Sequence, residues 1–230
     1  MRTCVVILVL ACVNVISFGQ PSSSKVYAVK CGRIIDGKGD EIQNNVTLII
    51  ENNKIKSVGA ASIPSDAEVI DLGKMTVLPG LIDCHTHVLL QGDITSQDYD
   101  NQLLKESIPY RTIRGAVAAQ AALRNGFTTI RDVETEGAMY ADVDIKKAIN
   151  NGIIEGPRMF VSTRALDVTG AYPLFGYSWE MRMPKGVQVV DGVDECRKAV
   201  REQIEFGADW IKVYVDRSYY IAEDGNIHSI

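Results

Sequence analysis

From residue 77 onward the sequence alternates between strand-like and helix-like segments, and this alternation restricts the fold more than any other feature. Residues 109–126 carry apolar side chains at helical spacing, with a proline near the start and Asn-Gly at the end, and the strand-like FTTIRDV follows. Residues 142–152 and 191–207 predict two further helices, which lead into RMFVST and ADWIKVYVD. Repeated strand–helix–strand segments indicate parallel βαβ units with right-handed crossovers.

A different pattern precedes this region. Short runs rich in β-branched residues, separated by Gly, Asn and Asp turn signals, fill residues 25–76 and predict a small antiparallel sheet. We therefore assign residues 20–76 to an N-terminal β-subdomain and residues 77–230 to an α/β domain.

The first 19 residues resemble a secretory signal peptide. A charged start is followed by an apolar run over residues 4–18, and small residues precede Gln20 at the spacing that signal peptidase prefers. A membrane anchor is the alternative, but the run is shorter than the ~20 apolar residues that span a bilayer. A secreted or periplasmic protein is expected, without stable membrane association unless Cys12 is the lipidated cysteine of a lipoprotein signal.

Composition excludes other classes of protein. The hydrophobic fraction of 46% and the charged fraction of 23% are those of an ordinary globular chain. A formal net charge of −5 without a Lys/Arg cluster argues against nucleic-acid binding. Behind the signal, Cys31, Cys84 and Cys196 form no disulfide framework, and a homo-oligomer is compatible with the sequence.

The segment PGLIDCHTH contains two of the three histidines in the chain. In a strand, Asp83, His85 and His87 would project from the same face, because alternate side chains point to opposite sides. Two adjacent imidazoles form half of a divalent-metal site, although such a pair could also decorate a solvated strand. The apolar flanks favour a strand covered on both sides. Asp83 would either accept a hydrogen bond from a ligand histidine or stabilise the strand end.

Lys212 is the second chemical signal. In ADWIKVYVD it shares one strand face with Trp210 and Tyr214, and a buried ammonium is costly unless it is neutralised. Lys212 would therefore pair with a carboxylate, or lose its proton and react with CO₂ to give a carbamate whose two oxygens bind metal.

Together these segments resemble the metal-dependent amidohydrolase superfamily, most closely its imidazolonepropionase-like and Xaa-Pro-dipeptidase-like secreted members. GRIIDGKG, IIENNKIKSVG and EVIDLGKMTVLPGLIDCHTH are similar to the β-subdomain and first barrel strand of that family. NGFTTIRDV, GPRMFVSTRAL and GADWIKVYVD are similar to its later strands. The resemblance implies a TIM-like (β/α)8 barrel with a small β-sandwich-like N-terminal subdomain.

The resemblance also implies a chemistry. His85 and His87 would bind the more buried metal, and Lys212, as a carboxylated lysine, would bridge two metals. One or two divalent ions, with zinc expected, would activate a water that hydrolyses a C–N bond in an amide, cyclic amide or dipeptide. The substrate is thus a small molecule. A non-catalytic metal-binding or scaffold protein, and a phosphotriester or lactone hydrolase, are the alternatives.

Several features depart from that family. The stretch from Leu81 to the end is much shorter than the ~250 residues of a typical barrel, so a partial barrel, truncated after its fourth strand, is expected. The family's remaining metal histidines and catalytic aspartate fall beyond Lys212, and no catalytic residue is assigned. His228, in a Gly/Asn-rich segment, is expected to be an exposed loop residue.

Four further residues are weaker candidates. Asp132, at the end of FTTIRDV, is expected near the metal ligands as a supporting residue, or else as a helix cap or an arginine partner. Tyr172, Tyr177 and Trp179 would form part of a substrate wall or simply pack within their loop.

Overall fold

The computed structural model describes residues 25–230 except 60–61, 92–95, 171–173, 175, 216–218, 222, 224 and 230. The expected signal peptide, with Cys12, lies outside the described residues, as does Tyr172. The chain divides into two compact units, the first ending at Pro79 and the second beginning at Gly80.

The first unit is a single four-stranded sheet in the order β3-β2-β1-β4. Its strands are β1 (Val26–Ile34), β2 (Gln43–Glu51), β3 (Lys54–Gly59) and β4 (Glu68–Val77). The predicted antiparallel pairing holds for β1–β2 and β2–β3, but β4 pairs parallel to β1. The described residues of this unit form one sheet and not the two stacked sheets of a sandwich.

Gly32 allows the unexpected β1–β4 pairing. The register between these strands shifts between Cys31 and Arg33. At this shift Gly32 lies so close to β4 that a Cβ atom would stand 2.3 Å from the carbonyl oxygen of Gly73. Only glycine permits this approach.

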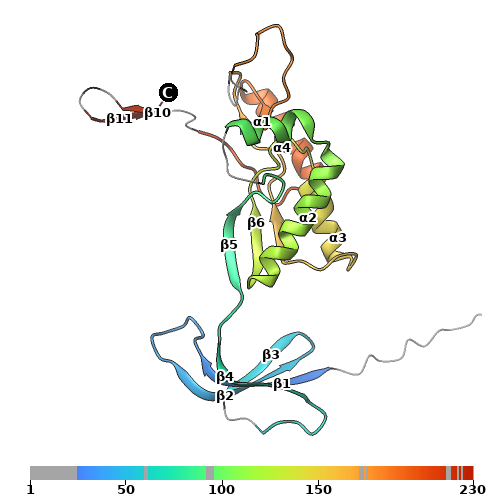
Figure 1. Cartoon of the computed structure of the whole chain (residues 1–230), viewed down its shortest axis with the longest axis vertical. Coiled ribbons are helices and arrows are strands. Elements are labelled where there is room, and N and C mark those ends of the chain that lie inside the picture. Colours follow the sequence, from blue (N-terminus) through green and yellow to red (C-terminus); the bar gives the residue numbers. More distant parts are fainter. Residues whose placement is uncertain are drawn as a thin grey trace, which may run out of the picture. The chain divides into compact units, whose positions relative to one another are not determined.

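The second unit contains a three-stranded parallel sheet in the order β5-β6-β7. The strands are β5 (Leu81–Thr86), β6 (Phe127–Asp132) and β7 (Arg158–Val161). Helices α2 (Ile108–Arg124) and α3 (Ala141–Asn150) pack on this sheet (Figure 1) and share a core that includes Ala119, Ile130, Ile145 and Val161. The predicted α/β arrangement with parallel strands is confirmed, and the described residues form no closed barrel.

Local signals set the ends of the helices. At the start of α2 the Ser107 side chain accepts a hydrogen bond from the backbone amide of Tyr110. At its end the backbone amide of Asn125 donates hydrogen bonds to the last carbonyl groups of the helix. Helix α1 (Ser96–Lys105) precedes α2, and α4 (Val193–Phe206) ends at Gly207, whose φ of 106° only glycine adopts readily. No helix in the described part of the chain is both long and apolar enough to cross a bilayer.

The prediction of a continuous strand over ADWIKVYVD is wrong. Val213 forms an isolated parallel bridge with Leu166, which belongs to β8 (Leu166–Asp167), and β8 pairs with β9 (Gln188–Val189). Val213 and Val215 are exposed, so the packing that would complete this strand is not supplied by the described residues.

The loop prediction for His228 is also wrong at the level of the backbone. His228 lies in β11 (Ile227–Ser229), opposite Tyr220 of β10 (Tyr219–Ile221), in an antiparallel hairpin. The Gly-Asn signal at residues 225–226 therefore lies between two paired strands rather than in an extended loop.

Candidate metal centre

The carboxyl ends of β5 and β6 bring the two candidate ligands together. His85 lies within β5 and His87 follows its end, and their Nε2 atoms are 3.3 Å apart. His85 is exposed and His87 half-buried. The expectation of a strand covered on both sides is wrong, because β5 is an edge strand on which Leu81 and Ile82 are 48% and 65% exposed.

Protons compete only weakly with a metal for His87. Burial, followed by the charge of His85, lowers its pKa to about 4, although the backbone carbonyl of Glu134 opposes this shift. His87 is therefore neutral at pH 7, which is the form that binds metals.

Asp132 accepts hydrogen bonds from both sequence neighbours of His87. Its Oδ1 accepts the Val88 amide at 2.7 Å and the Thr86 hydroxyl at 3.2 Å, and the side chain is fully buried. Burial and the nearby Asp142 raise the pKa of Asp132 well above its usual value. The contacts of Asp132 are neither those of a helix cap nor those of an arginine partner.

Asp83 acts on the backbone and not on an imidazole. Its Oδ1 accepts the amide of His85 at 2.9 Å, a local bond that shapes the end of β5. Of the two roles considered for Asp83, this contact corresponds to stabilisation of the strand end.

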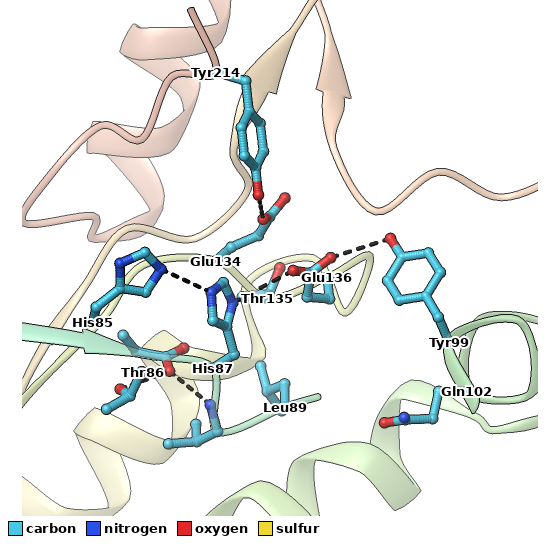
Figure 2. A network of polar contacts seen from close by, with 12 residues as sticks. His85, Thr86, His87, Leu89, Tyr99, Gln102, Glu134, Thr135, Glu136 and Tyr214 are labelled. Carbon is cyan, nitrogen blue, oxygen red and sulfur yellow. Dashed lines mark hydrogen bonds and ion pairs between the residues drawn. The ribbon is translucent and has the colours of Figure 1, made fainter. Parts of the chain in front are cut away.

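Two glutamates that were not anticipated complete the cluster. Glu134 and Glu136 follow β6, and both are buried. Figure 2 shows His87 between His85 and Glu136, with Tyr99 and Tyr214 reaching the glutamates from different sides. Ligand atoms of His87, Glu134 and Glu136 lie within 4.8 Å of one another. The only available signal was ETEG directly after a strand that ends beside the histidines.

Burial dominates the electrostatics of these glutamates. Together with Glu136 it raises the pKa of Glu134 to about 9, against the hydrogen bond from Tyr214. Burial likewise raises the pKa of Glu136. A hydrogen bond with the Glu134 side chain opposes this shift most strongly, followed by Tyr99, Arg111 and Lys212. Such a site favours the approach of positive charge.

Arg111 connects the two loops that carry the cluster. Its buried guanidinium donates to the carbonyls of Leu89, Thr135 and Glu136 at 2.9–3.2 Å. Leu89 lies two residues after His87, and so α2 sets the spacing between the histidine loop and the glutamate loop.

Lys212 approaches the same cluster from the chain beyond α4. Its charge acts on His87, Glu134 and Glu136, and its Nζ lies 4.9 Å from the ring centre of Tyr214. Lys212 is half-buried. The structure thus places it within electrostatic range of the cluster.

The proposed substrate wall has little packing in the described residues. Trp179 is 91% exposed, and Tyr177 hydrogen bonds to Asp100 of α1. Neither aromatic ring has a described contact with the histidines.

The histidine pair fits a divalent metal. Two imidazole nitrogens bound at about 2.0–2.1 Å to a tetrahedral zinc lie about 3.3 Å apart. This is the observed Nε2–Nε2 distance, and the neutral state of His87 provides a free electron pair. The donor set therefore suits zinc or a similar borderline cation.

Comparison with known proteins agrees with the resemblance seen in the sequence. The model of the amidohydrolase family matches residues 76–224. Ochratoxinase from Aspergillus niger is 34% identical over 212 residues, which cover 83% of this chain and 42% of that protein. Imidazolonepropionase from Vibrio cholerae is 40% identical over 77 residues, covering 33% of this chain and 18% of that protein.

Solved structures share the fold. A Xaa-Pro dipeptidase with bound methionine in the active site superimposes with a TM-score of 0.69 at 30% identity, covering 87% of this chain and 50% of that one. The chain thus spans about half the length, or less, of the relatives that it matches.

Proposed function

Because the chain belongs to the amidohydrolase family, we propose that it contributes metal ligands to a hydrolase that cleaves the C–N bond of an amide, cyclic amide or dipeptide. The names of its relatives support this class of small substrate, since they include an imidazolonepropionase and a Xaa-Pro dipeptidase. The observation that carries the proposal is the 3.3 Å approach of the His85 and His87 Nε2 atoms.

His85 and His87 would hold the metal, with Lys212, as its carbamate, the proposed third ligand. A divalent ion bound there would lower the pKa of a water to about 7 and polarise the scissile carbonyl. The chain's own residues prepare this site. Burial keeps His87 neutral, and Asp132 holds Thr86 and Val88 so that the imidazole is fixed in place.

Metal analysis of the purified chain tests the ligands. We expect near-stoichiometric metal in the unsubstituted chain, its loss in the double variant His85→Ala/His87→Ala, and a reduced content in Lys212→Ala. The matched control is His228→Ala, which removes the third histidine of the chain and leaves the metal content unchanged. A folded chain that carries no metal and takes up none on titration would contradict the proposal.

A substrate panel tests the reaction class. The metal-loaded chain is incubated with Xaa-Pro dipeptides, N-acyl amino acids and lactams, and release of a free amine is measured. We expect cleavage of at least one amide, lost in the double histidine variant. Cleavage that survives this double substitution would place the chemistry elsewhere.

A further inference from the structure

The two nitrogens of the His87 ring face different partners. Nε2 faces His85, whereas Nδ1 lies 3.4 Å from Oε1 of the Glu136 carboxyl group. Nδ1 is buried, and among the described residues no hydrogen bond of good geometry satisfies it. In a neutral imidazole one nitrogen carries the proton and the other holds the free electron pair, so the partner of Nδ1 decides whether Nε2 can bind metal.

We propose that Glu136 is a positioning residue that accepts the Nδ1–H of His87 and thereby keeps Nε2 unprotonated and aimed at the metal position beside His85. This inference rests on the proposed function, because it concerns the same histidine pair. Outer partners of this kind orient metal-binding histidines, and their loss commonly weakens metal affinity by about 10–100-fold.

Contacts from Tyr99 and Arg111 hold Glu136 where this role requires it. The Tyr99 hydroxyl donates to Oε2 at 3.1 Å, which leaves Oε1 to face His87. Arg111 donates to the Glu136 backbone carbonyl at 2.9 Å and to the Leu89 carbonyl, and so fixes the distance between the two loops. The carboxylate is thus placed from α1 and α2 at once.

The backbone of Glu136 is itself strained. Its φ is +49°, in the left-handed region that residues with a side chain rarely adopt. Strained residues of this kind persist where the surrounding contacts impose them, and they cluster at functional sites. At Glu136 the strained backbone coincides with the contacts from Arg111 and Tyr99.

A different arrangement would place the cation between His87 Nδ1, Glu134 and Glu136, whose ligand atoms lie within 4.8 Å of one another. That arrangement would leave His85 without a role. The Nε2–Nε2 approach argues against it, as does the Tyr214 hydroxyl, which already donates to Glu134.

The tautomer of His87 can be read directly by NMR, without metal. The chain has three histidines, so ¹⁵N-histidine labelling gives three ring systems, which single His→Ala variants assign. Long-range ¹H–¹⁵N spectra are recorded at about pH 8, where ordinary histidines are neutral. Metal affinity is measured in parallel by competition with a zinc chelator.

Three variants separate the alternatives. In the unsubstituted chain we expect His87 to be protonated at Nδ1. Glu136→Ala shifts the proton toward Nε2 and weakens zinc affinity at least 10-fold, whereas Glu136→Gln, whose amide oxygen still accepts, stays closer to the unsubstituted chain. Glu155→Ala, at an exposed carboxylate outside the cluster, is the control and leaves the tautomer unchanged. Should Glu136→Ala reduce the folded fraction, Tyr99→Phe removes the Oε2 contact and gives the same readout in milder form.

Two results would overturn the inference. An unchanged Nδ1–H tautomer and zinc affinity in folded Glu136→Ala would assign the Nδ1 proton to another acceptor, such as the backbone carbonyl of Glu134. Zinc binding that is lost in Glu134→Gln but retained in His85→Ala would place the cation among the glutamates. If the unsubstituted chain binds no zinc at all, the proposed function fails, while the metal-free tautomer still decides the role of Glu136.

Discussion

Asp132 illustrates how one buried carboxylate can position a candidate ligand, His87, through the residues on either side of it. Its Oδ1 receives both hydrogen bonds from the neighbours of His87, whereas Oδ2 has no described hydrogen-bond partner. We expect Asp132→Ala to lower the free energy of unfolding by about 1–3 kcal/mol, because the buried Val88 amide loses its acceptor. Asp132→Asn, which retains Oδ1, serves as the control in urea unfolding followed by circular dichroism. Equal losses in the two variants would contradict this account.

Asp142 predicts a dependence of stability on pH. It is fully buried, and burial raises its pKa to about 7 from 3.8, although the amides of Thr163 and Val143 oppose the shift. Asp132 and Asp209 face it as like charges. The folded chain therefore binds a proton that the unfolded chain has released between about pH 4 and 7, and stability falls as the pH rises through this window.

The size of this effect follows from the difference in pKa. A difference of about 3 units corresponds to about 4 kcal/mol at 1.36 kcal/mol per unit. In Asp142→Asn we expect the unfolding free energy, measured in urea from pH 4.5 to 8, to vary less with pH. The absolute stability of the variant is less informative, because asparagine can replace only one of the two acceptors. An identical pH slope in both proteins would show that other groups cause it.

Individual site residues could be predicted from the sequence where their position in a strand determines their neighbours. Alternation in a strand placed His85 and His87 together, and the cost of a buried ammonium drew attention to Lys212. Glu134 and Glu136 could not be found in this way, because their role depends on the meeting of two loops far apart in the sequence and on a left-handed backbone at Glu136.

Among the elements, α2 packs closely against the loop after His87 at Gly115. A Cβ on Gly115 would lie 2.9 Å from Cδ2 of Leu89 and 3.0 Å from Cδ1 of Ile145. Alanine is the better helix former by about 1 kcal/mol. We nevertheless expect Gly115→Ala to destabilise the second unit by about 1–3 kcal/mol, because overpacking displaces these neighbours. Thermal unfolding measures the change, and Val117→Ala, on the exposed face of α2, is the near-neutral control. A more stable Gly115→Ala chain would contradict the packing argument.

Helices α2, α3 and α4 were predictable because their signals are local. Apolar spacing, Pro109, Asn125 and Gly207 mark their extents without reference to the rest of the chain. The parallel β1–β4 pairing and the single bridge at Val213 were not predictable, since they depend on contacts between distant segments. The direction in which two strands pair depends on tertiary contacts, whereas a few adjacent residues determine where a helix ends.

For the whole molecule, metal binding should stabilise one unit selectively. All candidate ligands lie between Gly80 and the C-terminus. At a free zinc concentration about 100 times the dissociation constant, binding adds about 2.7 kcal/mol to the folded state. Proteolytic cuts in the second unit that require its unfolding are therefore expected to slow by up to about 100-fold.

Mass spectrometry of the proteolytic fragments locates these cuts. Cuts within the sheet of β1 to β4 are expected to keep their rate, which provides an internal control. The double variant His85→Ala/His87→Ala should show no protection by zinc. Equal protection of both units would indicate that zinc acts away from the histidine pair.

The family and the parallel α/β sheet could be inferred at this scale, and both are confirmed. The sandwich-like form of the first unit stays a prediction, because the strand pattern gives the number of strands but not how they stack, and the described residues form one sheet.

The contact between Gly115 and Leu89 also has an evolutionary consequence. Since a methyl group at position 115 and a leucine at position 89 would compete for the same space, the two positions are not free to vary independently. Relatives with alanine at the position of Gly115 are expected to carry a smaller side chain at the position of Leu89, and those that keep leucine are expected to keep glycine. Covariation between a helix and the loop that follows the strand of the candidate ligands would then be the trace, across lineages, of a steric conflict between two side chains.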